Sequence, residues 1–137
     1  MRLYLDTSVI VPLFVAESRS SDAHAGLIGQ NLYVSDLAAA EFSAAISARV
    51  RTDEMSAADA LSLFTTFDAW AGKAANRAQI EAGDMAVTLA LVRRPELALR
   101  MPDAANLAIA QRLGAKVFTF DQQMAAAAAA LGLSVLT

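Results

Sequence analysis

Four carboxylates are spaced so that one metal site could collect them. Asp6 and Asp121 each follow a short apolar run, whereas Glu41 and Asp103 lie inside alanine-rich stretches with helical spacing. Carboxylate oxygens suit Mg²⁺ and Mn²⁺, and such an ion can activate a water molecule and stabilise charge on a phosphate. The pattern predicts a metal-dependent hydrolase.

The same acids have a simpler interpretation that stays open at this point. Asp6 and Asp121 each precede a helical pattern and could be N-caps, and Asp103, just after Pro102, could only favour the helix dipole. Glu41 is different, because its helical face is rich in alanine and no lysine or arginine lies one turn away. A buried carboxylate without a partner is costly. We therefore interpret Glu41 as a ligand of a cation, or as a residue that lies next to such ligands.

Short apolar runs alternate along the chain with amphipathic stretches. We expect strands over residues 3–5, 32–34, 78–81, 116–120 and 133–136. We expect helical or amphipathic segments over residues 9–16, 20–28, 37–50, 56–70, 83–94, 102–113 and 124–131. The two long segments in the middle predict a helical hairpin. The alternation is typical of an α/β protein with a mainly parallel sheet covered on both faces. Ligands of such sheets bind beyond the carboxyl ends of the strands, where Asp6 and Asp121 should lie.

Composition limits the possibilities further. A chain of 137 residues is the size of one domain, so we expect a single domain over 1–137. Its 56% hydrophobic content, with only 18% charged residues, predicts that a partner covers part of the surface, in a homodimer or a larger complex. The absence of cysteine excludes disulfides and thiolate metal sites. No stretch is long enough to cross a membrane or resembles a signal peptide, so we expect a cytoplasmic protein.

The charge balance does not decide the substrate. The net charge is −3, and the four candidate acids account for all of the negative excess. If a divalent cation neutralised them, the remaining surface would be roughly neutral. Nucleic acid is therefore neither demanded nor excluded by charge alone.

Four motifs together resemble a known family. They are Leu5-Asp6-Thr7-Ser8-Val9, Ser35-Asp36-Leu37 leading to Glu41, Asp103-Ala104-Ala105-Asn106-Leu107-Ala108, and Thr119-Phe120-Asp121. In this order, over nearly the whole chain, they resemble the PIN-domain ribonucleases, and most closely the VapC toxins of type II toxin–antitoxin systems. The resemblance implies a PIN-like three-layer α/β/α fold with a central sheet of about five strands.

The resemblance also implies roles for particular residues. It makes Asp6, Glu41, Asp103 and Asp121 the metal-binding and catalytic acids of an Mg²⁺-dependent (or Mn²⁺-dependent) endoribonuclease, with Thr119 supplying a hydroxyl near the site. Hydrolysis by metal-activated water would leave 5′-phosphate and 3′-hydroxyl ends. A further position, Asn106, varies among similar proteins, so we interpret its amide as a substrate or water contact.

Substrate and partner surfaces are less distinct in the sequence. Arg93, Arg94 and Arg100 precede Asp103 and are candidates for phosphate contacts with RNA, although basic residues at a helix end are often only solvated. The resemblance implies a cognate VapB-like antitoxin that covers an apolar groove, in a toxin–antitoxin hetero-oligomer. The stripe of Leu63, Phe67 and Trp70 could line that groove or belong to the core.

Two other classes of protein have to be weighed. An acid-pocket phosphatase would need a second aspartate two residues after Asp6, where Ser8 stands, and a phospho-acceptor domain would need a paired acid beside a late lysine. A non-catalytic PIN-like interaction module would use the fold for assembly alone. The presence of all four acids argues against that loss of function.

Overall fold

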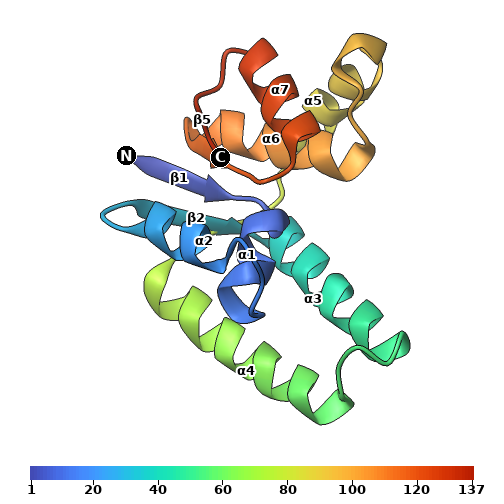
Figure 1. Cartoon of the computed structure of the whole chain (residues 1–137). Coiled ribbons are helices and arrows are strands. Elements are labelled where there is room, and N and C mark those ends of the chain that lie inside the picture. The colour runs from blue at the N-terminus through green and yellow to red at the C-terminus, as the bar shows by residue number, and fades with distance from the viewer.

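A central parallel sheet organises the chain, and the computed structural model describes all 137 residues (Figure 1). The strands are β1 Arg2–Leu5, β2 Asn31–Ser35, β3 Asn76–Ala78, β4 Lys116–Phe118 and β5 Val135–Leu136, in the spatial order β3-β2-β1-β4-β5. Every pair of neighbours is parallel. The α/β class and the parallel sheet of five strands that we predicted are confirmed.

Seven α-helices and one short 3₁₀ helix connect the strands. They are α1 Thr7–Phe14, α2 Ser20–Leu27, α3 Asp36–Arg51, α4 Ala57–Ala74, α5 Ala82–Val92, η1 Pro95–Leu97, α6 Met101–Leu113 and α7 Gln122–Ala130. The Ser35 hydroxyl accepts from the Ala38 N–H and so caps α3, and Ser56 caps α4 in the same way. Gly114, at a φ of 62°, ends α6 in the left-handed conformation that glycine favours. Helices α3 and α4 form the predicted hairpin.

The sheet divides the helices into two layers (Figure 1). Helices α1 to α4 lie on one face and α5 to α7 on the other. Alternate residues of β1 serve the two layers, because Leu3 and Leu5 belong to one buried cluster and Tyr4 to the other. The first layer is rich in aromatic rings, with Phe42 and Phe67 stacked at 4.5 Å between centroids. No helix is long and apolar enough to cross a membrane.

All five strands differ from their predicted bounds: the first two are longer by one or two residues, the third begins at Asn76 and not at residue 78, and the fifth begins at Val135 and not at residue 133. The ends of the third and fourth strands have a clear physical cause. The third strand ends at Ala78, not at residue 81, because the Glu81 N–H already donates to the Asp84 carboxylate at the start of α5. The fourth strand ends at Phe118, not at residue 120, because the N–H groups of Phe120 and Asp121 donate to side-chain hydroxyls. At the ends of both strands, polar side chains accept hydrogen bonds from backbone N–H groups, which are then not available for pairing within the sheet.

Candidate metal centre

Asp6 stands where β1 ends and α1 begins. Its side chain is almost buried, with 6% of the residue exposed. The Oδ2 atom accepts hydrogen bonds from the Ser8 hydroxyl at 2.6 Å, from the Thr119 hydroxyl at 2.9 Å and from the Ser8 N–H at 3.3 Å. Asp6 is the N-cap of α1, as the simpler interpretation of the sequence allowed.

Thr119 connects Asp6 to Asp121. Its fully buried hydroxyl donates to Asp6 and accepts from the Asp121 N–H at 3.0 Å. Asp121 in turn caps α7, because its Oδ1 accepts from the Met124 N–H at 3.1 Å. Ser8 adds a second link, since its hydroxyl accepts from the Phe120 N–H at 2.9 Å. The ends of β1 and β4 are therefore tied together beside the two aspartates.

Glu41 reaches the same end of the sheet from α3. Its Oε1 accepts from the Asn106 amide at 2.6 Å, and the same amide donates to the Pro102 carbonyl at 2.8 Å. The Asn106 oxygen accepts from the Tyr4 hydroxyl, which also contacts the Ser35 hydroxyl at 2.6 Å. Asn106 is fully buried and its amide is bonded to Glu41 and Pro102 within the protein, whereas a contact with substrate or water stays a prediction.

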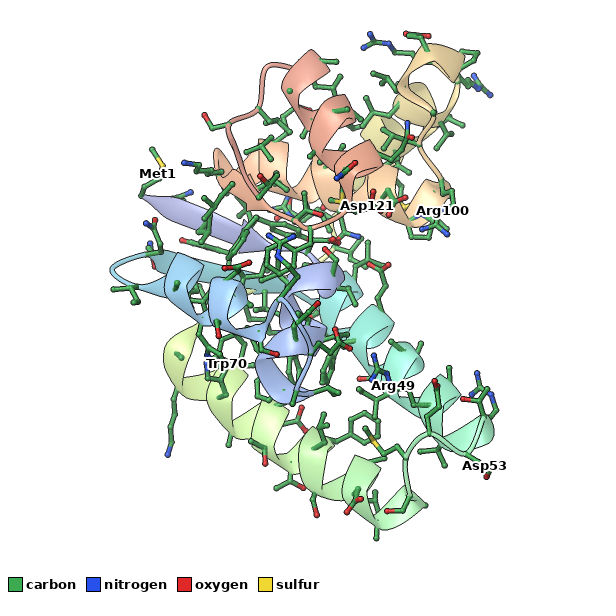
Figure 2. All side chains as sticks on the ribbon, in the orientation of Figure 1. Met1, Arg49, Asp53, Trp70, Arg100 and Asp121 are labelled. Atoms are coloured by element: carbon green, nitrogen blue, oxygen red, sulfur yellow. The ribbon has the colours of Figure 1, made fainter.

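Asp103 lies in the first turn of α6, with 14% of its side chain exposed. The Arg100 guanidinium donates to its Oδ2 at 3.3 Å, although 81% of the arginine side chain faces solvent. Figure 2 shows Arg100 and Asp121 on the same side of the molecule, beyond the end of β1. An exposed ion pair of this kind is weak and easily exchanged for another partner.

Burial and mutual repulsion act on two of the four acids. Burial raises the pKa of Glu41, the amide of Asn106 offsets part of the effect, and the charges of Asp6 and Asp103 raise the pKa further. Burial also raises the pKa of Asp103; Arg100 opposes this, whereas Asp121 and Asp6 add to it. The four acids therefore lie within electrostatic range of one another, and a cation among them would relieve the repulsion.

The acids nevertheless do not form a closed cluster. No group of three or more His, Cys, Asp or Glu side chains is arranged to hold a metal ion, which differs from our expectation of four carboxylates gathered together. The reason is visible in the contacts. Glu41 is held by an amide, Asp121 by a helix N-terminus and Asp103 by Arg100, so like charges stay apart. The donor set itself fits a hard divalent cation, because it consists only of oxygen.

The three arginines of the predicted substrate surface have different surroundings. Arg100 contacts a candidate acid, Asp103, whereas Arg94 pairs with Glu96 at 2.8 Å. Arg93 is the C-cap of α5, is exposed and forms no ion pair. Only Arg100 is thus brought directly to the acids.

Tyr4 and Ser35 are part of the site, and sequence reasoning missed both. A tyrosine inside the buried run of β1 was the available signal, because a buried hydroxyl usually has a hydrogen-bond partner. Ser35 belongs to one of the four motifs, but its contact with Tyr4 depends on how β2 lies beside β1. Neither contact can be seen from local spacing.

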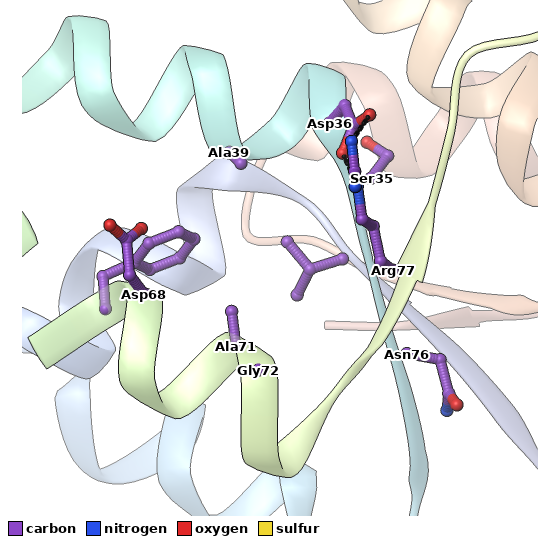
Figure 3. A pocket seen from close by; sticks show the side chains of 10 residues that line it. Ser35, Asp36, Ala39, Asp68, Ala71, Gly72, Asn76 and Arg77 are labelled. Carbon is purple, nitrogen blue, oxygen red and sulfur yellow. Dashed lines mark hydrogen bonds and ion pairs between the residues drawn. The ribbon is translucent and has the colours of Figure 1, made fainter. Parts of the chain in front are cut away.

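A pocket of about 210 Å³ lies between α3, α4 and β3 (Figure 3). Its apolar lining includes Ala39, Phe67 and Ala71. At its rim the Arg77 guanidinium donates to both oxygens of Asp36, at 2.7 and 2.9 Å. None of the four candidate acids lines this pocket, so it is a feature separate from the acid site.

Comparison with known proteins identifies the family. The family model described as the PIN domain matches residues 3–130, and the chain therefore belongs to the PIN domain family. No curated protein sequence matches significantly.

Solved structures with the same fold come from several organisms. Mycobacterium tuberculosis VapC20, described as a sarcin–ricin loop cleaving toxin, is 18% identical with a TM-score of 0.71, over 91% of this chain and 94% of that one. Rickettsia felis VapBC2, bound to a promoter DNA fragment, is 13% identical with a TM-score of 0.72, over 99% and 98%. VapBC-1 from nontypeable Haemophilus influenzae is 12% identical with a TM-score of 0.69, over 99% and 97%. At these identities the similarity establishes the fold.

Proposed function

We propose that this PIN-domain protein is a VapC-type endoribonuclease toxin that depends on Mg²⁺ or Mn²⁺ and hydrolyses phosphodiester bonds in RNA. The observation that supports the proposal is that Asp6, Glu41, Asp103 and Asp121 lie near the carboxyl edge of the sheet within electrostatic range of one another, with the pKa values of Glu41 and Asp103 raised by burial and, to a smaller extent, by neighbouring acids. Such an arrangement costs the fold free energy unless a cation compensates it. Membership of the PIN family and the similarity to VapC structures support the same assignment.

The four acids would hold the ion. When bound, the ion would lower the pKa of a water molecule and stabilise negative charge on the phosphate oxygens. Asp6 is fixed by Ser8 and Thr119, and Asn106 fixes one oxygen of Glu41. The second oxygen of Glu41, Oε2, makes no hydrogen bond within the protein, and we propose that it accepts the proton of the attacking water. The raised pKa of Glu41 favours this role.

RNA would reach the acids past α6. Arg100 lies next to Asp103 and is the first candidate for a phosphate contact, with Arg93 and Arg94 further from the acids. The exposed guanidinium of Arg100 can exchange Asp103 for a phosphate once a cation neutralises the carboxylate. The choice of RNA would come from shape and from contacts around the site, because the reaction itself needs no 2′-hydroxyl group.

We also propose that a VapB-like antitoxin inhibits the protein in the cytoplasm. Several structures with this fold are complexes of a toxin with its antitoxin. The α3–α4 hairpin offers the pocket of Figure 3, with an apolar lining and a charged rim, to a partner segment. Trp70 packs beside Phe67 in this layer, so Trp70→Ala should weaken an antitoxin complex while the toxin stays folded. An unchanged affinity would remove the hairpin from the interface.

The first test is thermal stability with Mg²⁺, Mn²⁺ or EDTA. A ligand at 100 times its dissociation constant adds about 2.7 kcal/mol to the free energy of unfolding. We expect a metal-dependent rise in Tm that Asp103→Asn abolishes and that Asp68→Asn, an exposed acid on α4, retains. No rise in the wild type, together with no cleavage of RNA, would favour the non-catalytic interaction module.

A further inference from the structure

An arginine is stacked on a ring that stands inside one of the motifs of the acid site. The guanidinium of Arg19 lies over the ring of Phe120, with 3.9 Å between the Cζ atom and the ring centroid. Phe120 stands between Thr119 and Asp121 in the chain. Its ring also packs edge-on against Phe118, at 5.3 Å between centroids, and so is held in place just beyond the end of β4. Arg19 is thus one side chain away from the candidate metal centre.

The protein itself uses little of the Arg19 guanidinium. Its Nε donates to the Asp22 carboxylate at 2.8 Å, and its terminal N–H groups form no hydrogen bond within the chain. The pair is open to water, with 46% of the Arg19 side chain and 62% of the Asp22 side chain exposed. An exposed pair of this kind adds little to stability. A planar guanidinium with free terminal donors is, however, well suited to bind a phosphate.

A hollow of about 390 Å³ lies beside this arginine. Its lining includes Arg19 and Gly26 from α2, together with Phe118 and Leu136 at the ends of β4 and β5. Glycine is needed at position 26, because a Cβ atom there would overlap the ring of Phe118. The hollow has the size of a ligand site, for which about 300–1,000 Å³ is typical. Because β4 and β5 end here, it opens at the same edge of the sheet as the acids.

We propose that Arg19, Phe120 and this hollow form a nucleotide subsite of the acid site. Arg19 binds a phosphate of the RNA, and the hollow receives the base next to that phosphate. The apolar side chains of Phe118 and Leu136 suit the flat face of a base, and a ring that supports an arginine is a common element of single-strand binding. The proposal rests on the ribonuclease function proposed above.

The position of Arg19 also gives the RNA a direction across the site. Arg19 belongs to α2, whereas Arg100 belongs to α6, and these helices cover opposite faces of the sheet (Figure 1). Arg100 contacts Asp103, and Arg19 lies beside the residue that precedes Asp121. A strand held by both arginines would therefore pass over the four acids, with its scissile phosphate between them.

The first test separates substrate binding from catalysis. A labelled single-stranded RNA of mixed sequence is the probe. Arg19→Met should raise KM about tenfold and change kcat by less than about twofold, because Arg19 contacts a nucleotide and not the bond that breaks. The matched control is Arg51→Met, since Arg51 is exposed at the end of α3 and forms no ion pair. Both constants should stay unchanged in this control.

The salt dependence of RNA affinity tests the phosphate contact. Fluorescence anisotropy in an Asp103→Asn background measures binding without rapid cleavage. Arg19→Met should reduce the slope of log affinity against log salt by about 0.7, the value for one phosphate of a single strand. Arg19→Lys should keep the slope, because the charge remains, but should still bind more weakly than the parent because lysine lacks the planar fork.

Filling the hollow tests the place of the base. Ala25 is exposed on α2 and lines the hollow, so Ala25→Leu should raise KM without changing kcat. Ala58→Leu, a change at an exposed alanine of α4, is the matched control and should have no effect.

The outcomes distinguish the subsite from the nuclease. An unchanged KM in Arg19→Met, with RNA cleaved normally by the wild type, would overturn the subsite and leave the ribonuclease function standing. A lower Tm in Arg19→Met, together with an unchanged KM and salt slope, would show that the arginine only attaches α2 to the end of β4. A wild type that neither binds nor cleaves RNA would overturn both proposals, and metal-dependent stability would then report on the acid site alone.

Discussion

Two carboxylates of this protein, Asp84 and Glu41, lie in opposite electrostatic surroundings. Asp84 is 2% exposed, and both of its oxygens accept hydrogen bonds from Arg112, at 2.8 and 3.0 Å. Burial opposes its ionisation, but Arg112 and the Glu81 N–H outweigh burial and hold the pKa of Asp84 below its usual range. Burial raises the pKa of Glu41, the amide of Asn106 offsets only part of this rise, and the charges of Asp6 and Asp103 add to it.

The difference separates a carboxylate that stabilises the fold from one that is available for chemistry. Arg112 gives Asp84 a positively charged partner, and this ion pair connects α5 to α6. The chain supplies neutral donors to Glu41 and Asp6, and the only cation near Asp103 is the largely exposed Arg100. The chain itself therefore leaves the negative charge of the acid site largely uncompensated.

Removing one acid of the site should have the largest effect. Asp103→Asn is expected to lower the rate of RNA cleavage by about 100-fold or more, since it takes away one of few charges that hold the ion. Its stability in EDTA should not fall, because the lost ion pair with Arg100 is exposed. Cleavage of a labelled RNA, with Asp68→Asn as the control, measures the effect. Full activity in Asp103→Asn would remove this residue from the site.

Breaking the Asp84–Arg112 pair should have the opposite effects, a lower stability and an unchanged response to metal. Arg112→Met leaves a buried carboxylate without its cation and should lower the free energy of unfolding by about 3 kcal/mol, the lower end of the range for a buried pair, because 29% of the arginine side chain is exposed. The metal-dependent gain in Tm should persist, because none of the four site acids contacts this pair. Urea denaturation with and without Mg²⁺ measures both quantities. Asp36→Asn, which breaks an exposed pair with Arg77, is the matched control and should change stability far less.

The Tyr4 hydroxyl is expected to act on the site through Asn106 and Glu41. Tyr4→Phe should weaken metal binding by about 10-fold, the lower end of the range for groups that orient metal ligands. The ring still fills its place in the core, so most of the stability should remain. Calorimetric titration with Mn²⁺ gives the affinity. A variant that loses stability but keeps its Mn²⁺ affinity would show that the hydroxyl has only a structural role.

The smallest effect should be a change in how the metal-free protein responds to pH. Because the pKa of folded Glu41 is raised above 4.5, folding takes up a proton there, and stability falls as pH rises from that value through the raised pKa. The pKa of Asp84 is lowered, so its contribution is present above the unfolded value and is lost as pH falls through the folded one. Glu41→Gln should therefore raise Tm in EDTA at neutral pH by a few degrees. A lower Tm across the range would contradict this sign.

Local patterns in the sequence predicted most of the fold, and they are also the basis on which the four candidate acids were proposed. The alternation of strands with helices and the helical hairpin each depend on patterns among neighbouring residues, and each is confirmed. The separation of the acids could not be predicted in this way. It depends on which hydrogen bond each side chain makes, and those donors come from elements distant in sequence, as the contact between Asn106 and Glu41 illustrates.

The strand order also determines when the site can exist during synthesis. β1 pairs with β4, which brings Thr119 and Asp121 beside Asp6, although more than a hundred residues separate these positions in the chain. A nascent chain that has not yet released residues 116–121 therefore lacks one side of the acid site, whatever else has folded. At about 5–20 residues per second, the 115 residues after Asp6, up to Asp121, take roughly 6–20 s to synthesise. For a protein proposed to be toxic, one side of the proposed catalytic centre is therefore absent during that time.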